Sequence, residues 1–260
     1  MSTPSAVPTK LALFQSRTRA LIRRGQTEVE EAAAPWIARF SVYATLAAIV
    51  YRDNGDGLTA PSGWTSVEQH DDPTTSLYFE VWAQTTATPP EVAVVFKGTH
   101  EPKDWWSNAR WMTRFLPIGW DQYTVVQEQI ASVVARARLR LPQARVVAVG
   151  HSLGGGLAQQ AAYAHPDIKK VFAFDPSPVT GFRSVRAADR TANARGIHIF
   201  RVYEKGEILA YLRGFLKRFL PLSVKDPEIV EVRLNLSKGL AVIEHSMVDL
   251  AKRMNEFQLT

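Results

Sequence analysis

One serine of this chain is flanked by glycines in a way that favours nucleophilic chemistry. Ser152 lies in the segment GHSLG, residues 150–154, between an apolar run at 144–149 and a helix-like segment. In a sharp turn from a strand into a helix, side chains two positions before and after the serine would clash, and glycine removes that clash. The hydroxyl then stands above the sheet, where it can attack a carbonyl carbon. The pattern predicts a nucleophilic Ser152; the alternative is a glycine-rich turn without a chemical role.

The residue after this serine is suited to the same chemistry. A carbonyl group under attack develops an oxyanion, which needs about two preorganised N–H donors. We expect the N–H of Leu153 to be one of them, because this residue follows the nucleophile. Leu153 also opens the predicted helix, whose N-terminus favours developing negative charge.

The elements that must position Ser152 alternate between strand-like and helix-like patterns. Residues 91–96 are almost entirely apolar, which is typical of a strand buried on both faces. Residues 123–140 repeat apolar side chains at helical spacing. The alternation predicts an α/β fold with a mostly parallel central sheet flanked by helices. The expected strands are 77–83, 91–96, 144–149, 170–174 and 197–203, and the expected helices include 35–51 and 123–140.

Length and composition favour one large domain after a short amino-terminal arm. The chain has 260 residues, of which 46% are hydrophobic, and this is enough for a packed core. Residues 1–27 contain no Asp or Glu and carry several arginines. We therefore expect 1–30 to be an arm that is partly disordered or forms a short basic helix at 11–24. Residues 31–260 are expected to form the α/β domain.

Net charge and apolar stretches indicate which binding partners and which compartment to expect. The formal net charge of +6 is compatible with nucleic acid or an anionic membrane. Most basic residues are scattered among acidic ones and no nucleic-acid-binding motif is apparent, so no nucleic-acid partner is expected. No signal peptide is visible, and the apolar stretch 40–51 is too short to span a bilayer. We expect a cytoplasmic protein or one exported by a non-Sec route, and the oligomeric state stays open.

The sequence does not favour metal or cofactor chemistry. It has no cysteine, no zinc-ligand spacing and no nucleotide-type glycine loop. Residues 53–57, DNGDG, resemble the first half of a calcium-binding loop. They lack the glutamate that such a loop needs as its bidentate ligand, so a plain turn is favoured. We expect neither a cofactor nor a metal ion.

Two segments resemble the class 3 lipases, the fungal triacylglycerol lipase type of the α/β-hydrolase superfamily. They are GHSLGGGLA at 150–158 and FKGTHEPKDWWSN at 96–108. The resemblance implies an α/β-hydrolase fold and a serine hydrolase that cleaves carboxylic esters, above all lipids, through a Ser-His-acid triad and an acyl-enzyme. It also implies that the N–H of Thr99 is the second oxyanion donor. The alternatives are another acyl hydrolase, such as a thioesterase or amidase, and a non-catalytic binding protein on the same fold.

Chain order then favours one histidine as the base and leaves two acids open. In α/β-hydrolases the triad residues follow in the order serine, acid, histidine. His245 stands after all the expected strands, as the order and the resemblance require. Glu207 stands after the strand at 197–203, where the family usually has an aspartate. The rival is Asp175, at the end of the strand at 170–174, and we favour Glu207.

A basic amphipathic segment follows the favoured acid. Residues 208–220 place their apolar side chains along one helical face, with Arg213, Lys217 and Arg218 on the other side. Such a helix can rest on an anionic membrane. The alternatives are a lid over an acyl pocket and an ordinary helix packed on the sheet.

Overall fold

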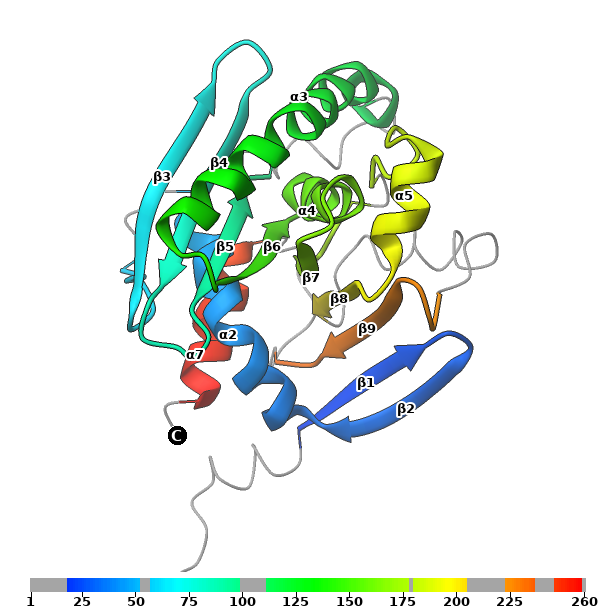
Figure 1. Ribbon diagram of the computed structural model, residues 1–260. Helices are drawn as coiled ribbons and strands as arrows, with labels where there is room; N and C mark the ends of the chain where they lie inside the picture. Colours follow the sequence, from blue (N-terminus) through cyan, green and yellow to red (C-terminus); the bar gives the residue numbers. More distant parts are fainter. Residues whose placement is uncertain are drawn as a thin grey trace, which may run out of the picture.

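The described residues form a single nine-stranded sheet, shown in Figure 1. The computed structural model describes residues 18–51, 57–98, 111–177, 180–204, 223–236 and 246–258, with only the backbone of 111–121. The strand order is β2-β1-β9-β8-β7-β6-β5-β4-β3. The strands are β1 (Arg19–Arg24), β2 (Thr27–Ala32), β3 (Trp64–Asp72), β4 (Leu77–Gln84), β5 (Glu91–Phe96), β6 (Arg145–His151), β7 (Ile168–Phe174), β8 (His198–Glu204) and β9 (Glu228–Leu234).

The centre of this sheet is parallel and its flanks are antiparallel. The neighbours β5 to β9 all run in the same direction. The outer strands β1, β2, β3 and β4 pair antiparallel. Every residue of β5 is buried, as expected for a strand covered by helices on both sides. The predicted α/β fold is therefore confirmed, with a sheet that is mixed rather than purely parallel.

Helices cover both faces of the sheet (Figure 1). On one face α2 (Ala33–Ile49) packs against α7 (Met247–Gln258). The other face carries α3 (Trp111–Arg140), α4 (Leu153–Ala164) and α5 (Ala187–Ala194). No described helix combines the length and apolar character that a membrane span requires.

Two hydrophobic clusters, one on each face, hold the layers together. Under α2, the fully buried Phe40 packs against the rings of Phe172 and Phe200 on neighbouring strands. On the opposite face, Ile130 and Val134 of α3 lie in the other cluster. Burying a large apolar side chain contributes about 1.5–3 kcal/mol, so these layers fix the strand ends on which the site depends.

The expectation of a separate amino-terminal arm with a basic helix is wrong over the described residues. β1 pairs antiparallel with β9, and β2 forms the edge of the sheet. Ala20 and Ile22 are buried while Arg19 and Arg24 are exposed. Because successive side chains of a strand point to opposite faces, Ala20 and Ile22 reach the same core cluster beneath α2. The domain therefore starts before residue 31, and residues 1–17 lie outside the described part.

Candidate active site

Ser152 forms the turn between β6 and α4 in a strained backbone conformation. Its φ is 56° and its ψ is −123°, a conformation that costs a non-glycine residue about 1–3 kcal/mol. The residue is buried, with 2% of its surface exposed. Serine is a preferred N-cap residue, yet among the described residues the Ser152 side chain makes no cap hydrogen bond to α4. The turn therefore has the geometry predicted for a nucleophile.

The flanking glycines are required by the close approach of backbone segments. A Cβ atom on Gly150 would lie 2.2 Å from the carbonyl oxygen of Gly154. A Cβ atom on Gly154 would lie 2.3 Å from the carbonyl oxygen of Phe96. Both distances are far inside van der Waals contact, so no side chain fits at either position. The physical reason inferred from the sequence for these two glycines is confirmed.

Backbone hydrogen bonds fix the turn against the next strand. The N–H of Ser152 donates to the carbonyl oxygen of Phe174 on β7 at 3.0 Å. The carbonyl oxygen of Ser152 accepts from the N–H groups of Gly155 and Ser177, each at 3.0 Å. Leu153 is the first residue of α4, where amide N–H groups have no acceptor within the helix. The positive end of the helix dipole therefore points to the site, as the predicted oxyanion role of Leu153 requires.

The end of β5 lies directly beside the serine. β5 and β6 are parallel neighbours, and Phe96 is in register with Gly150. A Cβ atom on Gly98 would lie only 3.3 Å from the Cβ atom of Ser152. The next residue is Thr99, the predicted second oxyanion donor, which lies outside the described residues. The strand before Thr99 thus ends where an oxyanion donor is needed.

A tyrosine that the sequence did not single out joins these two strand ends. The hydroxyl of Tyr51 accepts a hydrogen bond from the N–H of Gly98 at 3.0 Å. The same oxygen lies 2.9 Å from Nδ1 of His151. Burial raises the pKa of Tyr51 well above its usual range. The ammonium group of Lys97 lies 6.0 Å from the centre of the Tyr51 ring and 5.5 Å from that of Tyr78.

Asp175, the rival acid, lies at the carboxyl end of β7. It is 5% exposed and has a φ of 37°, which is rare for a residue with a side chain. Its N–H donates to the carbonyl oxygen of Val202 on β8 at 2.8 Å. Asp175 therefore directly follows β7, the neighbour of the strand that leads into Ser152.

The favoured acid, Glu207, and the expected base, His245, lie outside the described residues, as does the segment 208–220. The residues that flank them are described. Glu204, the last residue of β8, accepts a hydrogen bond from Nη1 of Arg253 on α7 at 2.9 Å. The hydroxyl of Ser246 accepts a hydrogen bond from the N–H of Asp249 at 3.2 Å, in the first turn of α7. The chain is thus anchored three residues before Glu207 and one residue after His245.

The other described histidines are engaged elsewhere. The ring of His70 stacks on Phe79 at the outer strands β3 and β4. His165 ends α4, and His198 pairs with Glu228 at 2.8 Å at the amino-terminal ends of β8 and β9. His100 lies outside the described residues. Among the described side chains, no group of three or more His, Asp or Glu residues is arranged to hold a metal ion.

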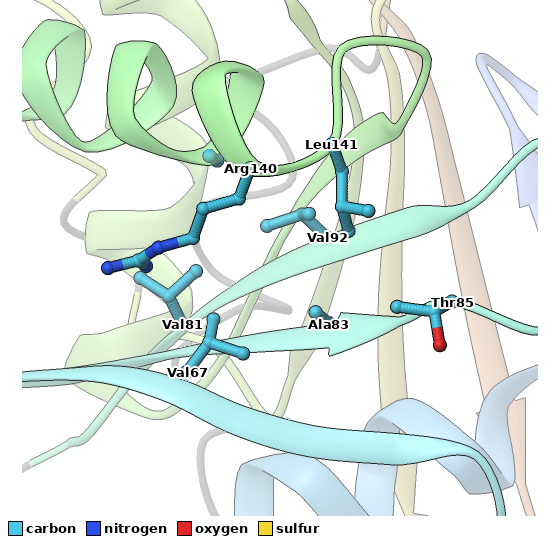
Figure 2. Close-up of a pocket in the computed structure, with 8 residues that line it drawn as sticks. Val67, Val81, Ala83, Thr85, Val92, Arg140 and Leu141 are labelled. Carbon is cyan, nitrogen blue, oxygen red and sulfur yellow. The ribbon is translucent and has the colours of Figure 1, made fainter.

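A cavity of about 180 Å³ lies away from the serine, between the outer strands and the end of α3 (Figure 2). Val92, near the start of β5, and Leu141, just after α3, both line it. Ser152 stands at the opposite, carboxyl end of the parallel strands. The lining is mostly apolar: Val67, Val81, Ala83, Thr85, Val92, Ala137, Arg140 and Leu141. This cavity is therefore separate from the candidate active site.

Comparison with solved structures gives the fold type. The lipase of Rhizomucor miehei in its propeptide complex is 18% identical, with a TM-score of 0.54 over 95% of this chain and 86% of that chain. A lipase from Rhizopus microsporus var. chinensis is 18% identical, with a TM-score of 0.52 over 75% and 73%. A triacylglycerol lipase whose catalytic centre is described as a serine protease triad is 19% identical, with a TM-score of 0.50 over 75% and 78%. These likenesses confirm the α/β-hydrolase type of fold.

The sequence itself matches one family. No curated protein sequence matches the chain. The sequence model of the Tle-like phospholipase domain matches residues 42–220, more than half of the chain. This region contains the elbow at Ser152 and the strand end at Gly98. The expectation of a hydrolase that acts on carboxylic esters of lipids is confirmed, and the chain belongs to the family of Tle-like phospholipase domains.

Proposed function

We propose that this lipid ester hydrolase cleaves acyl ester bonds of glycerophospholipids, with Ser152 as the nucleophile. The observation that carries the proposal is the elbow: a buried serine at φ 56° between two glycines that no other residue can replace. Such strain persists where surrounding structure enforces it, and it is concentrated at functional sites. The phospholipase description of the family supports the substrate class.

The reaction follows the general course of serine acyl hydrolases. Ser152 Oγ attacks the acyl carbonyl carbon while His245 takes the hydroxyl proton. The N–H groups of Leu153 and Thr99 stabilise the oxyanion. When the tetrahedral intermediate collapses, the ester bond breaks and His245 returns the proton to the departing lysophospholipid oxygen. Water then attacks the acyl-enzyme in the same way and releases the fatty acid.

The anchoring of α7 supports His245 as the base. The cap at Ser246 fixes the helix start one residue after this histidine. α7 packs against α2, the helix from whose end Tyr51 reaches the elbow. The described histidines His70, His165 and His198 are engaged away from Ser152, and His151 faces Tyr51.

The order of the strands supports Glu207 as the acid. The proposed base follows β9, and β8 is the neighbour of β9 in the sheet. Glu207 follows β8, whereas Asp175 follows β7, one strand further away. The carboxylate must contact the imidazole to orient it and to stabilise its charged form. The ion pair between Glu204 and Arg253 holds the end of β8 to α7 and so favours this contact.

The segment 208–220 is proposed to rest on the phospholipid surface. Its apolar face and the basic side chains opposite fit the interface of an anionic membrane. Each basic side chain near such a surface contributes about 1 kcal/mol of attraction. Replacing Arg213, Lys217 and Arg218 by Gln should therefore weaken binding to vesicles of phosphatidylglycerol about a hundredfold. Binding to phosphatidylcholine vesicles should change little, and equal losses on both would contradict a charge-based contact.

The test of the proposed function is fatty acid release from phosphatidylglycerol and phosphatidylcholine vesicles. Ser152→Ala should lose at least about 10³-fold in kcat while it stays folded. Ser132→Ala is the matched control, because that hydroxyl lies on the exposed surface of α3. Activity in Ser152→Ala would overturn the mechanism. Cleavage of p-nitrophenyl esters without any release from phospholipids would leave the nucleophile intact and overturn the substrate class.

A further inference from the structure

The hydroxyl of Tyr51 contacts two segments that are far apart in the sequence. It accepts a hydrogen bond of 3.0 Å from the N–H of Gly98, which lies 47 positions after Tyr51 in the sequence. It also lies 2.9 Å from Nδ1 of His151, 100 positions along the chain. The Tyr51 and His151 rings meet edge to face, with their centres 5.8 Å apart. One oxygen atom thus links the end of β5 to the end of β6.

Each contact lies one residue before a group that the proposed reaction uses. Gly98 precedes Thr99, the proposed oxyanion donor, and His151 precedes Ser152. The spacing between the two segments is tight, because a Cβ atom on Gly98 would lie 2.5 Å from both the His151 carbonyl oxygen and the Tyr51 hydroxyl. The distance between nucleophile and oxyanion donor therefore depends on how these strand ends are held.

The tyrosine is itself held in place. It follows α2, and its N–H donates to the carbonyl oxygen of Ala48 at 3.2 Å. α2 packs on the strands through the core cluster that contains Phe40. Since burial raises the pKa of Tyr51 above its ordinary value of 10, its hydroxyl is protonated and uncharged at neutral pH. The hydroxyl can therefore make both contacts at neutral pH.

We propose that Tyr51 is a positioning residue, which fixes the oxyanion segment against the nucleophile through Gly98 and His151. The inference rests on the proposed function of Ser152 and Thr99. In this proposal Tyr51 acts through the residues next to those groups and does not itself bind substrate or transfer a proton. Loss of its hydroxyl should therefore slow acylation while substrate binding is unchanged, because a small displacement of an oxyanion donor weakens transition-state stabilisation.

The experiment compares Tyr51→Phe with Tyr43→Phe. Tyr43 lies on the side of α2 that faces the sheet, where its ring stacks on Phe172. Its hydroxyl donates to Glu91 at the start of β5 at 2.6 Å. Each variant removes one tyrosine hydroxyl that contacts β5, but at opposite ends of the strand. In Tyr51→Phe we expect kcat for a p-nitrophenyl ester to fall about tenfold, with KM unchanged within twofold. In Tyr43→Phe both constants should stay within twofold of wild type.

A second measurement does not depend on activity. Amide hydrogen exchange, followed by NMR, should show at least a tenfold loss of protection at Gly98 in Tyr51→Phe, with Val95 unchanged. Tyr43→Phe should leave the Gly98 amide as in wild type. A kcat within twofold of wild type, or unchanged protection at Gly98, would overturn the positioning role. If Ser152→Ala remains active, the proposed function fails instead, and the exchange result alone decides whether Tyr51 holds the segment.

Discussion

Glu204 and Arg253 form an ion pair of 2.9 Å between the end of β8 and the middle of α7. The Glu204 side chain is 13% exposed and that of Arg253 is 33% exposed, so the pair is partly shielded from water. β8 continues into the segment that contains the proposed acid, Glu207. α7 follows the proposed base, His245. The pair therefore connects the two chain segments that must meet for the imidazole to be oriented.

Loss of this pair should reduce activity more than stability. We expect Glu204→Gln to lower kcat roughly tenfold, because small displacements of catalytic groups are costly. Asp167→Asn is the matched control, since it removes a comparable pair with Arg138 at 3.1 Å, outside the site. Steady-state kinetics and thermal unfolding of both variants decide the matter. An equal loss of stability in both, with kcat unchanged, would show that Glu204 is a structural residue only.

The identity of the acid can be tested by removing charge without changing shape. Glu207→Gln should lower kcat by about 10⁴-fold, since the imidazole would lose the carboxylate that orients it. Asp175→Asn should keep kcat within about tenfold of wild type, because it leaves that contact in place. Both variants should be assayed on the same p-nitrophenyl ester. The opposite order of losses would assign the role to Asp175.

Gly154, two residues after the nucleophile, should not tolerate any side chain. Gly154→Ala places a methyl group 2.3 Å from the carbonyl oxygen of Phe96, and backbone on both sides must move. We expect the free energy of unfolding to fall by more than about 3 kcal/mol in urea denaturation. Gly196→Ala is the control, because φ is +70° there but nothing lies within 4 Å of the new atom. It should cost only about 1–2 kcal/mol, and equal losses would contradict the steric explanation.

Glu68 should make stability depend on pH in the acid range. Hydrogen bonds from Arg136 lower the pKa of this carboxyl below its ordinary value of 4.5, and the charge of Arg140 adds to the effect. The folded state therefore binds the proton more weakly than the unfolded state, and the stabilisation is complete above about pH 5. It is lost as the pH falls through the lowered pKa.

Glu68→Gln should accordingly reduce the free energy of unfolding by about 1 kcal/mol at pH 7, because both arginine partners are about half exposed. As the pH falls towards 2.5, the difference in stability between the variant and the wild type should shrink. Urea denaturation at both pH values measures the difference. A destabilisation that persists unchanged at pH 2.5 would mean that packing, and not charge, is responsible.

The sequence by itself determined the parts of the site that depend on local backbone geometry. The elbow at Ser152 needs glycine at 150, because a side chain there would clash with Gly154 four positions along the chain. It needs glycine at 154 because the end of the neighbouring strand β5 lies against that position, as the sharp turn from strand to helix led us to expect. The buried strands β5 and β6 can also be recognised in the sequence, because strands covered on both faces are almost entirely apolar. These local requirements were sufficient to predict the fold class and the nucleophile.

Only the tertiary structure decided which distant residues meet. β1 was expected as part of a helix, because its arginines obscure the alternation that places Ala20 and Ile22 on the buried face. Its pairing with β9 depends on residues about 210 positions away, which no local pattern indicates. Tyr51 carries no local signal, since a tyrosine at the end of an apolar helix is ordinarily a core residue. Its position between Gly98 and His151 follows from the packing of α2 on the sheet, a contact that no spacing in the sequence encodes.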